Sequence, residues 1–550
     1  MTYRRLASPL LLGCTLVVLM FGCSSSSDQN SPGGNGGGGA IGVGGYAGLS
    51  SGGLAGASGL PAGAAGLGQG GAQNGQGGNA QATLGGAQTG QGGAQTGQGG
   101  AQTDQGGAQT GQGGAQTSQG GAQNGQGGAT TTACTFTIDA TPSSVIPTVG
   151  VVQWSTTLSS VSSAHIDFGL TTNYGMTAPV DLTEANYKTL LLGMKASQTY
   201  HFRIVAEGGG QQCSSDDQSI QTGPLATNLP KPTVTTSNAQ ALAGGFLVSE
   251  VFQAGTAFIL DADGDIVWWY QPDIGDLSRI RMSYDGKYMW MGHGNVPKNS
   301  GQMVRVLMDG TNPENLSDQF SQLNHDFAVL PDETIIYIAY GSNSNNGCDD
   351  VIERSPDGTL RTIINSQTPF GDGQPCHCNA IQYSPDDDTV VVSELDHDAY
   401  FKVDRQGQVV WILGGNASYN DFTGTGSTWD NEHGLHVLGL DRLLIFNNGA
   451  NGGGAGGGSK AIEIQLDLSA WTATNVWEYA GQNGGSPISN NIMGSVQRLD
   501  NGNTLVTYST QGIIHEVDAN LNLLQELSWG LGGAVGYATK RASLYGPPPW

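Results

Sequence analysis

Between residues 376 and 415, apolar and polar residues alternate in four short runs separated by turn-forming residues. The runs are HCNAIQY, TVVVSEL, AYFKVD and QVVWILGG, and the gaps hold PDDD, DHD and RQG. Alternation with a period of two predicts β-strands, and Asp- and Gly-rich gaps predict tight turns. His377 and Asn379 stand two residues apart at the start of the first run, so both side chains are expected on one face of that strand.

Comparable units recur along residues 235–550 with a period of about 50 residues. They begin at GGFLVSEVFQ, SRIRMSYDG, NHDFAVLPDE, HCNAIQY, EHGLHVLGLD and MGSVQRLDNG. This period and the strand content are typical of a propeller rather than of a sandwich, barrel or solenoid. We therefore expect an all-β chain whose largest domain, residues 235–550, is a six-bladed β-propeller.

A second alternating region covers residues 132–224, before the Pro-rich join LPKPTV. It resembles a fibronectin type III sandwich, in which Tyr200 would take the tyrosine-corner position near the start of a late strand. Cys134 and Cys213 lie at its two ends and are disulfide candidates in an oxidising compartment.

The first 131 residues contain no pattern of a folded domain. Residues 1–22 have two arginines followed by an apolar run too short for a membrane span, which predicts a signal peptide. The run ends in Met-Phe-Gly-Cys, which resembles a bacterial lipoprotein box with Cys23 as the lipidated residue; ordinary signal-peptidase cleavage is the alternative. Residues 23–131 are rich in Gly, Gln and Ala and repeat GGAQTGQ, so we expect a disordered tether.

The net charge of the chain is −25, and only 12% of its residues are charged. This charge argues against nucleic acid and against anionic membrane surfaces as partners. Any contact with a membrane is expected through the N-terminal lipid alone. We expect an exported outer-membrane lipoprotein that faces the periplasm or the cell surface, since Ser24 follows Cys23.

Three histidines occur in the same phase of three successive repeats. His325, His377 and His433 each precede an Asp-containing turn by seven to nine residues. In a propeller the first strand of each blade lines the central channel, so the three imidazoles are expected to converge there. A single histidine is more often structural, but three in register predict a site.

Three histidines with an open position also describe a catalytic metal site, and Cys376 and Cys378 flank His377. Strand alternation places both thiols on the face opposite His377, so we predict no metal. Disulfide pairing of Cys348 with one of these two cysteines is the structural interpretation that we favour.

The motif H-x-N-A-I-x-Y-x-P-x-D-D-x-V-V-V-S at residues 377–393 is followed by K-V-D, V-x-W-I-L-G-G, E-H at 432–433 and F-N-N-G at 446–449. Together these motifs resemble the bacterial arylsulfate sulfotransferases. The resemblance implies a six-bladed propeller that carries a sulfuryl group on a channel histidine and passes it between phenols, without a cofactor. It implies His433 as the nucleophile.

By the same resemblance, His325, His377 and Asn379 would hold the sulfuryl oxygens and the leaving phenolate. One position departs from the family: Leu395 stands where the family has an arginine. A guanidinium suits the oxygens that gain charge in sulfuryl transfer, so its loss is expected to weaken or abolish activity.

The predicted activity is sulfuryl transfer from an aryl sulfate donor to a phenolic acceptor. Neutral His433 would attack sulfur, and a protonated His325 or His377 would donate to the departing phenolate. Two alternatives come from other classes of protein. One is a non-catalytic, surface-displayed binding propeller, suggested by Leu395, and the other is a metal- or quinone-dependent oxidoreductase.

Overall fold

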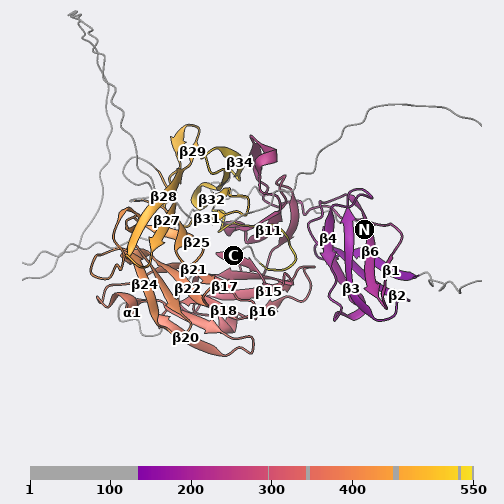
Figure 1. Cartoon of the computed structure of the whole chain (residues 1–550), viewed down its shortest axis with the longest axis horizontal. Coiled ribbons are helices and arrows are strands. Elements are labelled where there is room, and N and C mark those ends of the chain that lie inside the picture. Colours follow the sequence, from indigo (N-terminus) through magenta and orange to yellow (C-terminus); the bar gives the residue numbers. More distant parts are fainter. Residues whose placement is uncertain (1–133, 295–296, 342–346, 450–457, 531–533, 548–550) are drawn as a thin grey trace, which may run out of the picture. The chain divides into compact units, whose positions relative to one another are not determined.

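The computed structural model describes residues 134–294, 297–341, 347–449, 458–530 and 534–547. The predicted signal peptide, Cys23 and the tether lie outside these residues. Within the described ranges, no helix has the length and apolar character needed to cross a membrane. Almost all regular structure is β, and Figure 1 colours the strands along the chain.

The first region contains two antiparallel sheets. One has the order β1-β2-β5, and the other β4-β3-β6-β7 with β8 also paired to β6. Their strands are β1 (Phe136–Pro142), β2 (Gly150–Thr156), β3 (Val161–Gly169), β4 (Met176–Pro179), β5 (Thr189–Leu191), β6 (Thr199–Gly208), β7 (Gln211–Ser214) and β8 (Gln218–Gln221). Trp154 of the first sheet and Phe168 and Phe202 of the second share one buried cluster, so the sheets pack face to face.

Six further sheets follow, and their arrangement is consistent with a β-propeller; we call them blades 1 to 6. Blade 1 holds β35 (Thr539–Arg541), β10 (Phe246–Val251), β11 (Thr256–Leu260) and β12 (Ile266–Tyr270). Blade 2 holds β13 (Arg279–Met282), β14 (Tyr288–His293), β15 (Gln302–Leu307) and β16 (Glu314–Asn315). Blade 3 holds β17 (Leu323–Val329), β18 (Ile335–Ala339), β19 (Asp350–Arg354) and β20 (Leu360–Asn365).

Blade 4 holds β21 (Cys378–Ser384), β22 (Thr389–Glu394), β23 (Ala399–Asp404) and β24 (Val409–Gly414). Blade 5 holds β25 (Glu432–Val437), β26 (Arg442–Asn447), β27 (Lys460–Asp467) and β28 (Thr472–Ala480). Blade 6 holds β31 (Ser495–Arg498), β32 (Thr504–Tyr508), β33 (Ile513–Val517), β34 (Leu523–Ser528) and β9 (Thr233–Thr236). A hairpin of β29 (Gln482–Asn483) and β30 (Ser486–Pro487) precedes blade 6.

The helical segments of the described residues are short. They are α1 (Gln367–Phe370), η1 (Ala185–Tyr187), η2 (Ala239–Ala241), η3 (Phe252–Ala254), η4 (Ser317–Gln319), η5 (Leu395–His397), η6 (Thr425–Ser427) and η8 (Ser509–Gln511).

Neighbouring blades contact each other through their first strands, in the order β13, β17, β21, β25 and β31. Strands from outside this series complete blades 1 and 6. The C-terminal β35 pairs with β10 as the innermost strand of blade 1, and β9 pairs with β34 as the outermost strand of blade 6. Reading the repeats as contiguous segments misses this exchange, because the strands that pair are far apart in sequence.

The repeated turns have a side-chain cause. Asp261, Asp404 and Asp518 lie at or just after the end of the third strand of a blade. One carboxylate oxygen of each accepts backbone N–H groups two and four residues ahead. Such Asx turns satisfy the backbone while the chain reverses. Apolar residues then fill the space between blades, as Ile336, Val392 and Phe401 do between blades 3 and 4.

Candidate active site

Three histidines from neighbouring blades meet where the inner strands begin. His325 lies in β17, His377 directly precedes β21, and His433 is the second residue of β25. The Nε2 atoms of His325 and His377 are 3.2 Å apart. His433 lies near both, because His433 helps to lower the pKa of His325 and His377 helps to lower the pKa of His433. The structure thus brings the three histidines of the sequence analysis to one place.

The inner strands of blades 3, 4 and 5 each change register at or just after their histidine. The pairing of β17 with β18 shifts between Leu323 and Phe327, that of β21 with β22 between Cys378 and Ala380, and that of β25 with β26 between Glu432 and Leu435. The inner strands of blades 2 and 6 pair without such a shift in the described residues. His325 itself has φ +55°. Bulges re-aim side chains, and strained backbone of this kind clusters at functional sites.

The ring of His433 is oriented by an asparagine. Its Nδ1 lies 2.8 Å from Oδ1 of Asn448. The Nδ2 of Asn448 donates to the carbonyls of Asn490 and Met493, at 2.7 and 2.9 Å, which fixes which end of the amide faces the ring. His433 therefore carries its proton on Nδ1, and Nε2 keeps a lone pair.

A second asparagine orients His325. Asn324 accepts at Oδ1 from Nδ1 of His325 (2.6 Å) and donates from Nδ2 to Asp349 (3.1 Å). Nε2 of His325 is then an acceptor, so the 3.2 Å contact is a hydrogen bond donated by Nε2–H of His377. Asp349 also accepts the backbone N–H of Cys378 at 2.9 Å, which ties blade 3 to blade 4.

Burial keeps all three rings neutral. It lowers the pKa of His433 to about 4, where the bond to Asn448 opposes the shift and the charge of His377 adds to it. Burial and the two neighbouring rings hold the pKa of His325 well below its usual value, and burial lowers the pKa of His377 against the charges of Asp396 and Glu394. These lowered pKa values disfavour the protonated imidazole that the sequence suggested as proton donor. Three clustered, desolvated imidazoles disfavour a charge.

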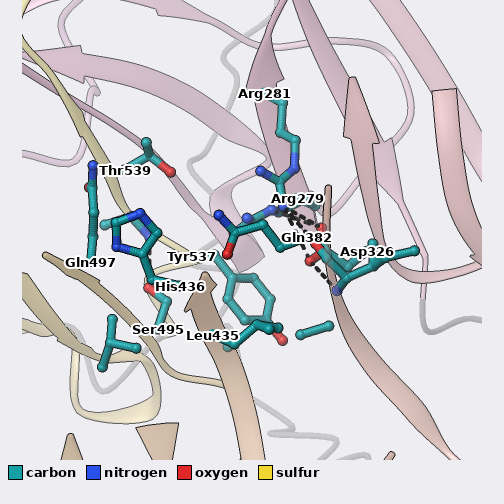
Figure 2. Close-up of a pocket in the computed structure, with 15 residues that line it drawn as sticks. Arg279, Arg281, Asp326, Gln382, Leu435, His436, Ser495, Gln497, Tyr537 and Thr539 are labelled. Atoms are coloured by element: carbon teal, nitrogen blue, oxygen red, sulfur yellow. Dashed lines mark hydrogen bonds and ion pairs between the residues drawn. The ribbon is translucent and has the colours of Figure 1, made fainter. Parts of the chain in front are cut away.

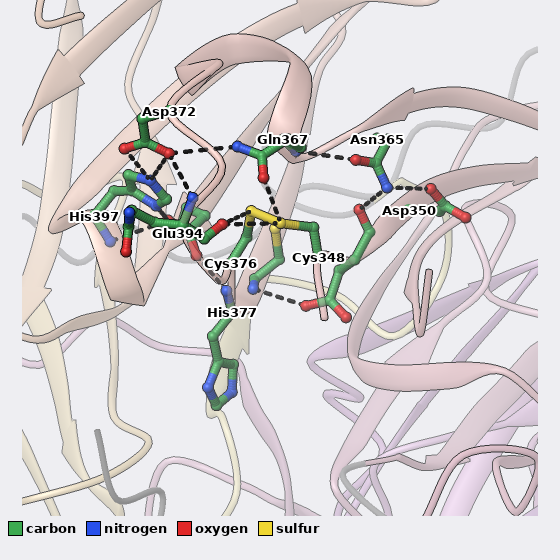
Figure 3. Close-up of a disulfide and its surroundings, with 12 residues drawn as sticks. Cys348, Asp350, Asn365, Gln367, Asp372, Cys376, His377, Glu394 and His397 are labelled. Atoms are coloured by element: carbon green, nitrogen blue, oxygen red, sulfur yellow. Dashed lines mark hydrogen bonds and ion pairs between the residues drawn. A yellow bond between two sulfur atoms is a disulfide. The ribbon is translucent and has the colours of Figure 1, made fainter. Parts of the chain in front are cut away.

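The backbone of His377 is held from both sides by the corner between β22 and η5. Its N–H donates to the carboxylate of Glu394, and its carbonyl accepts from the N–H of Leu395 at 2.9 Å. The preceding residue, Cys376, forms a disulfide with Cys348, as Figure 3 shows beside His377 and Glu394.

The other cysteines of the described residues have no contact with the channel rings. Cys134 and Cys213 form a disulfide in the first region. Cys378 is a free, buried cysteine, and burial raises the pKa of its thiol well above the usual value. A thiol in such surroundings stays protonated and unreactive.

Asn379 does not lie open to the channel. It is fully buried, and its Nδ2 donates to the carbonyl of Glu432 at 2.8 Å. Its own carbonyl accepts from the hydroxyl of Tyr537 at 3.2 Å. Asn379 thus links the strand that follows His377 to the residue that precedes His433.

Residues of the inner strands line a small cavity of about 30 Å³ (Figure 2). Asp326, Ala380 and Gly434 line it, and each directly follows a residue named above. Arg279 and Arg281 of blade 2 also line it, and Nε of Arg279 is 2.9 Å from Asp326. This volume holds one or two water molecules but no aromatic ring.

Leu395 is the first residue of η5, half-buried directly behind His377. It supplies no charge there. The inner strand of blade 2 does supply guanidinium groups, those of Arg279 and Arg281, which line the cavity. The pKa of Arg281 is lowered to about 10, mainly by burial, with the charge of Arg279 adding to the shift and the charge of Asp326 opposing it. Arg281 still carries its charge at neutral pH.

Among the described residues, one group of three acidic or metal-ligating side chains brings its ligand atoms within 4.8 Å of one another. It consists of Asp261, Asp263 and Asp265, and the ammonium group of Lys195 forms ion pairs with all three at 2.7 to 3.2 Å. The three histidines do not form such a group. The geometry gives the metal-dependent alternative no support.

Sequence reasoning missed the residues that orient the histidines. Asn324, Asp349, Glu394 and Asn448 all act through hydrogen bonds across strands or blades, and Tyr400 donates from its hydroxyl to the carbonyl of His433 at 3.0 Å. Asn448 did fall within the F-N-N-G motif, but nothing in that motif indicated which atom it would contact.

Comparison with solved structures found distant similarity to several proteins. A protein of unknown function from Bacteroides caccae is 12% identical, with 54% of this chain and 98% of that chain covered and a TM-score of 0.37. A streptogramin B lyase is 12% identical, covering 72% and 97%, with a TM-score of 0.32. The periplasmic gluconolactonase PpgL of Pseudomonas aeruginosa is 13% identical, covering 56% and 98%, with a TM-score of 0.30.

No curated protein sequence matches the chain. A family model does match, and its description is Arylsulfotransferase (ASST), over residues 231–530. The matched segment contains all three histidines, Asn324, Asn448 and Glu394. It spans more than half of the sequence, so this chain belongs to the arylsulfotransferase (ASST) family.

Proposed function

We propose that this protein transfers a sulfuryl group from an aryl sulfate to a phenol through a covalent intermediate on His433. The observation that carries the proposal is the hydrogen bond from Nδ1 of His433 to Asn448, which leaves a lone pair on Nε2. A pKa of about 4 keeps that atom unprotonated at neutral pH. Family membership supports sulfotransferase chemistry at this position.

In the first half-reaction, Nε2 of His433 attacks sulfur and the bond between sulfur and the aryl oxygen breaks. The phenolate leaves with the electron pair of that bond. Nε2–H of His377, which otherwise donates to His325 at 3.2 Å, is the donor available to the leaving oxygen. The phenolate then takes a proton from water, since the neutral rings have none to spare. The sulfuryl group remains on His433.

The second half-reaction reverses the first with another phenol. The acceptor hydroxyl gives its proton to water, and the phenolate oxygen, held by Nε2–H of His377, attacks sulfur. The N–S bond breaks and His433 regains its lone pair. The sequence is ping-pong and needs neither metal nor cofactor. Asn379 acts here by holding β21 against β25 rather than by binding the sulfuryl oxygens, since its amide already donates to Glu432.

The charges that line the cavity favour one orientation of the bound aryl sulfate. The guanidinium groups of Arg279 and Arg281 face one aspartate, Asp326, beyond the histidines. Burial raises the pKa of the nearby Glu250 to about 8, so it adds little negative charge at neutral pH. The cavity of about 30 Å³ excludes an aryl ring. The sulfuryl oxygens would therefore point toward the arginines and the ring away from them.

The test is to give the protein a chromogenic aryl sulfate without acceptor. We expect one equivalent of released phenolate and an acid-labile adduct with the mass of one SO₃ group, mapped to His433. His433→Ala should remove the adduct, while His515→Gln, a buried histidine of blade 6, should keep it. Release of phenolate without an adduct would overturn the covalent intermediate.

A second candidate is a non-catalytic binding propeller, and Leu395 is the observation that favours it. A protein of that kind would bind a donor analogue yet form no adduct. The same experiment therefore separates the two candidates.

We also propose that residues 132–224 form a fibronectin type III-like domain. The hydroxyl of Tyr200, near the start of β6, accepts the N–H of Lys195 at 2.8 Å, which supports a tyrosine corner. Export, lipidation at Cys23 and an outer-membrane location remain part of the proposal. Two disulfides, Cys134–Cys213 and Cys348–Cys376, support an oxidising compartment.

A further inference from the structure

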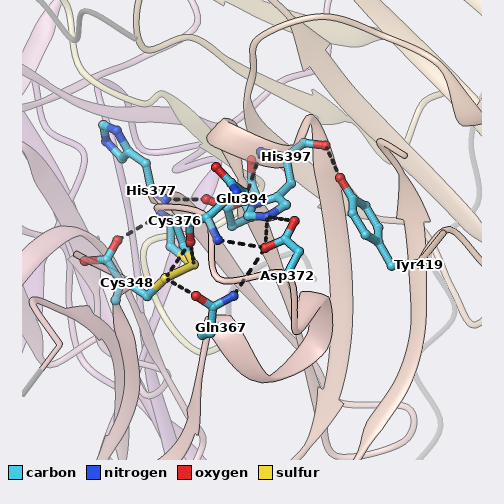
Figure 4. A network of polar contacts seen from close by, with 12 residues as sticks. Cys348, Gln367, Asp372, Cys376, His377, Glu394, His397 and Tyr419 are labelled. Atoms are coloured by element: carbon cyan, nitrogen blue, oxygen red, sulfur yellow. Dashed lines mark hydrogen bonds and ion pairs between the residues drawn. A yellow bond between two sulfur atoms is a disulfide. The ribbon is translucent and has the colours of Figure 1, made fainter. Parts of the chain in front are cut away.

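Behind His377, a buried histidine lies between two carboxylates. His397 ends η5, and its side chain is only 3% exposed. Nδ1 contacts the carboxylate of Glu394, and Nε2 is 3.2 Å from Asp372 (Figure 4). Its ring stacks on Phe370 at 4.0 Å. No step of the proposed reaction uses this histidine.

The carboxylate of Glu394 joins His397 to the reaction site. One of its oxygens accepts the backbone N–H of His377, and the other accepts Nδ1 and the backbone N–H of His397, the latter at 3.0 Å. Glu394 is fully buried. A buried carboxylate in this position needs a cationic partner, because removing one member of such a pair leaves an uncompensated charge.

The groups that face His397 are mostly anionic. Glu394 and Asp396 come from its own corner, Asp398 follows it, and Asp372 comes from the loop after α1. Tyr419, from the segment after β24, contacts the ring at a centroid distance of 5.6 Å. Burial opposes a charge on His397, but the bonds and charges of Glu394 and Asp372 outweigh it and raise the pKa above 6.5.

Asp372 lies on the segment that leads to the reaction site. Residues 371 to 377 connect α1 to His377, and the disulfide between Cys348 and Cys376 anchors the end of this segment. His397 contacts the segment at Asp372 and, through Glu394, at the N–H of His377. It is therefore bonded to both ends of the residues that carry His377 into the channel.

We propose that the imidazolium of His397, held between Glu394 and Asp372, is a positioning residue that fixes His377 for sulfuryl transfer and makes the rate depend on pH. This inference rests on the proposed function, because His377 is the donor to the leaving oxygen. The direction of this pH dependence follows from the contacts of His397 with the two carboxylates. The ion pair is complete well below the ordinary histidine pKa and is lost as pH rises through the raised pKa of His397 in the folded protein.

We expect the rate of adduct formation to fall at both low and high pH, so that its pH profile has an acid limb and an alkaline limb. The acid limb lies near pH 4 and reports protonation of the nucleophile His433. The alkaline limb lies above pH 6.5 and reports loss of the proton from His397. A Glu394→Gln protein keeps an acceptor for the N–H of His377 but removes the charge, so its alkaline limb should move to lower pH.

The test compares His397→Gln with the matched variant His515→Gln. His515 is also buried and bonded to a carboxylate, Glu526 at 3.0 Å, but lies on β33 of blade 6. In His397→Gln we expect adduct formation at pH 6.5 to slow by roughly tenfold to a hundredfold, since small misplacements of reacting groups cost that much. The alkaline limb should vanish, and His515→Gln should retain both limbs.

An unchanged alkaline limb in His397→Gln, or an equal loss in His515→Gln, would overturn the proposal. Should His397→Gln fail to fold, Glu394→Gln still decides, because an alkaline limb that does not move contradicts the role of the charge. A second readout does not need turnover: the NMR signals of the His377 ring should shift as His397 titrates. If the unaltered protein forms no adduct, the proposed function fails, and this coupling between the two rings is still measured.

Discussion

The bond between His433 and Asn448 offers a direct test of the nucleophile, because removing the acceptor should release the proton from Nδ1. In Asn448→Leu the side chain keeps a similar size but loses the carbonyl oxygen at 2.8 Å. The proton can then occupy Nε2, the atom that must attack sulfur. We expect adduct formation to slow sharply while binding of the donor changes little.

The magnitude follows from the hydrogen bonds. Leaving a buried N–H without a partner costs about 1–3 kcal/mol. If that cost falls on the reactive tautomer, the rate drops by about 5- to 150-fold. Asn448 also donates to Asn490 and Met493, so the free energy of unfolding should fall as well. Single-turnover phenolate release, measured well below the melting temperature, separates the two effects.

Asn503→Leu is the matched control. Asn503 is likewise buried and donates two hydrogen bonds from Nδ2, to Ala241 at 2.8 Å and to Glu516 at 2.7 Å, but it lies in blade 6. It should lose stability and retain the single-turnover rate. A normal rate in Asn448→Leu, or an equal slowing in both variants, would show that Asn448 does not set the tautomer of His433.

Three further outcomes are expected. Leu395→Arg should raise the rate of sulfuryl transfer, up to about a hundredfold if the new guanidinium reaches the sulfuryl oxygens, and steady-state kinetics with an aryl sulfate will show whether it does. Replacing Cys348 and Cys376 by serine should lower the free energy of unfolding by about 3 to 4 kcal/mol, from the loop of 28 residues that the disulfide closes, measured by chemical denaturation. Cys23→Ser should move the protein from the detergent-soluble membrane fraction to the soluble fraction; unchanged fractionation would contradict lipidation.

Local patterns predicted much of the β-structure. The four runs of residues 377–415 correspond to β21, β22, β23 and β24, because alternation along a strand and Asp-rich turns are both encoded within a few residues. The spacing of the histidines, 52 and then 56 residues, reflects the same repeat. It identified side chains that share a position in successive blades, and those side chains do lie together.

Interactions across blades were beyond the reach of such patterns. That β35 pairs with β10, and β9 with β34, depends on closing distant parts of the chain, and no short motif encodes it. The charge state of the histidines likewise depends on contacts between blades. Each ring alone would have an ordinary pKa, and only their burial and mutual proximity lower it.

The register shifts explain why strand alternation could not place the site in detail. A regular strand sends successive side chains to opposite faces, and extra residues in one strand of a pair interrupt that alternation. Between Leu323 and Phe327, four steps along β17 oppose two steps along β18; His325 lies in this bulge with φ +55°, and the neighbouring Asp326 lines the channel cavity. A histidine and an aspartate that follow each other in sequence can therefore both serve the channel: the first contacts His377 and the second holds Arg279. In a regular strand these two neighbouring side chains would point to opposite faces. The bulge in β17 is what lets the ring of His325 and the ion pair of Asp326 lie on the channel side together.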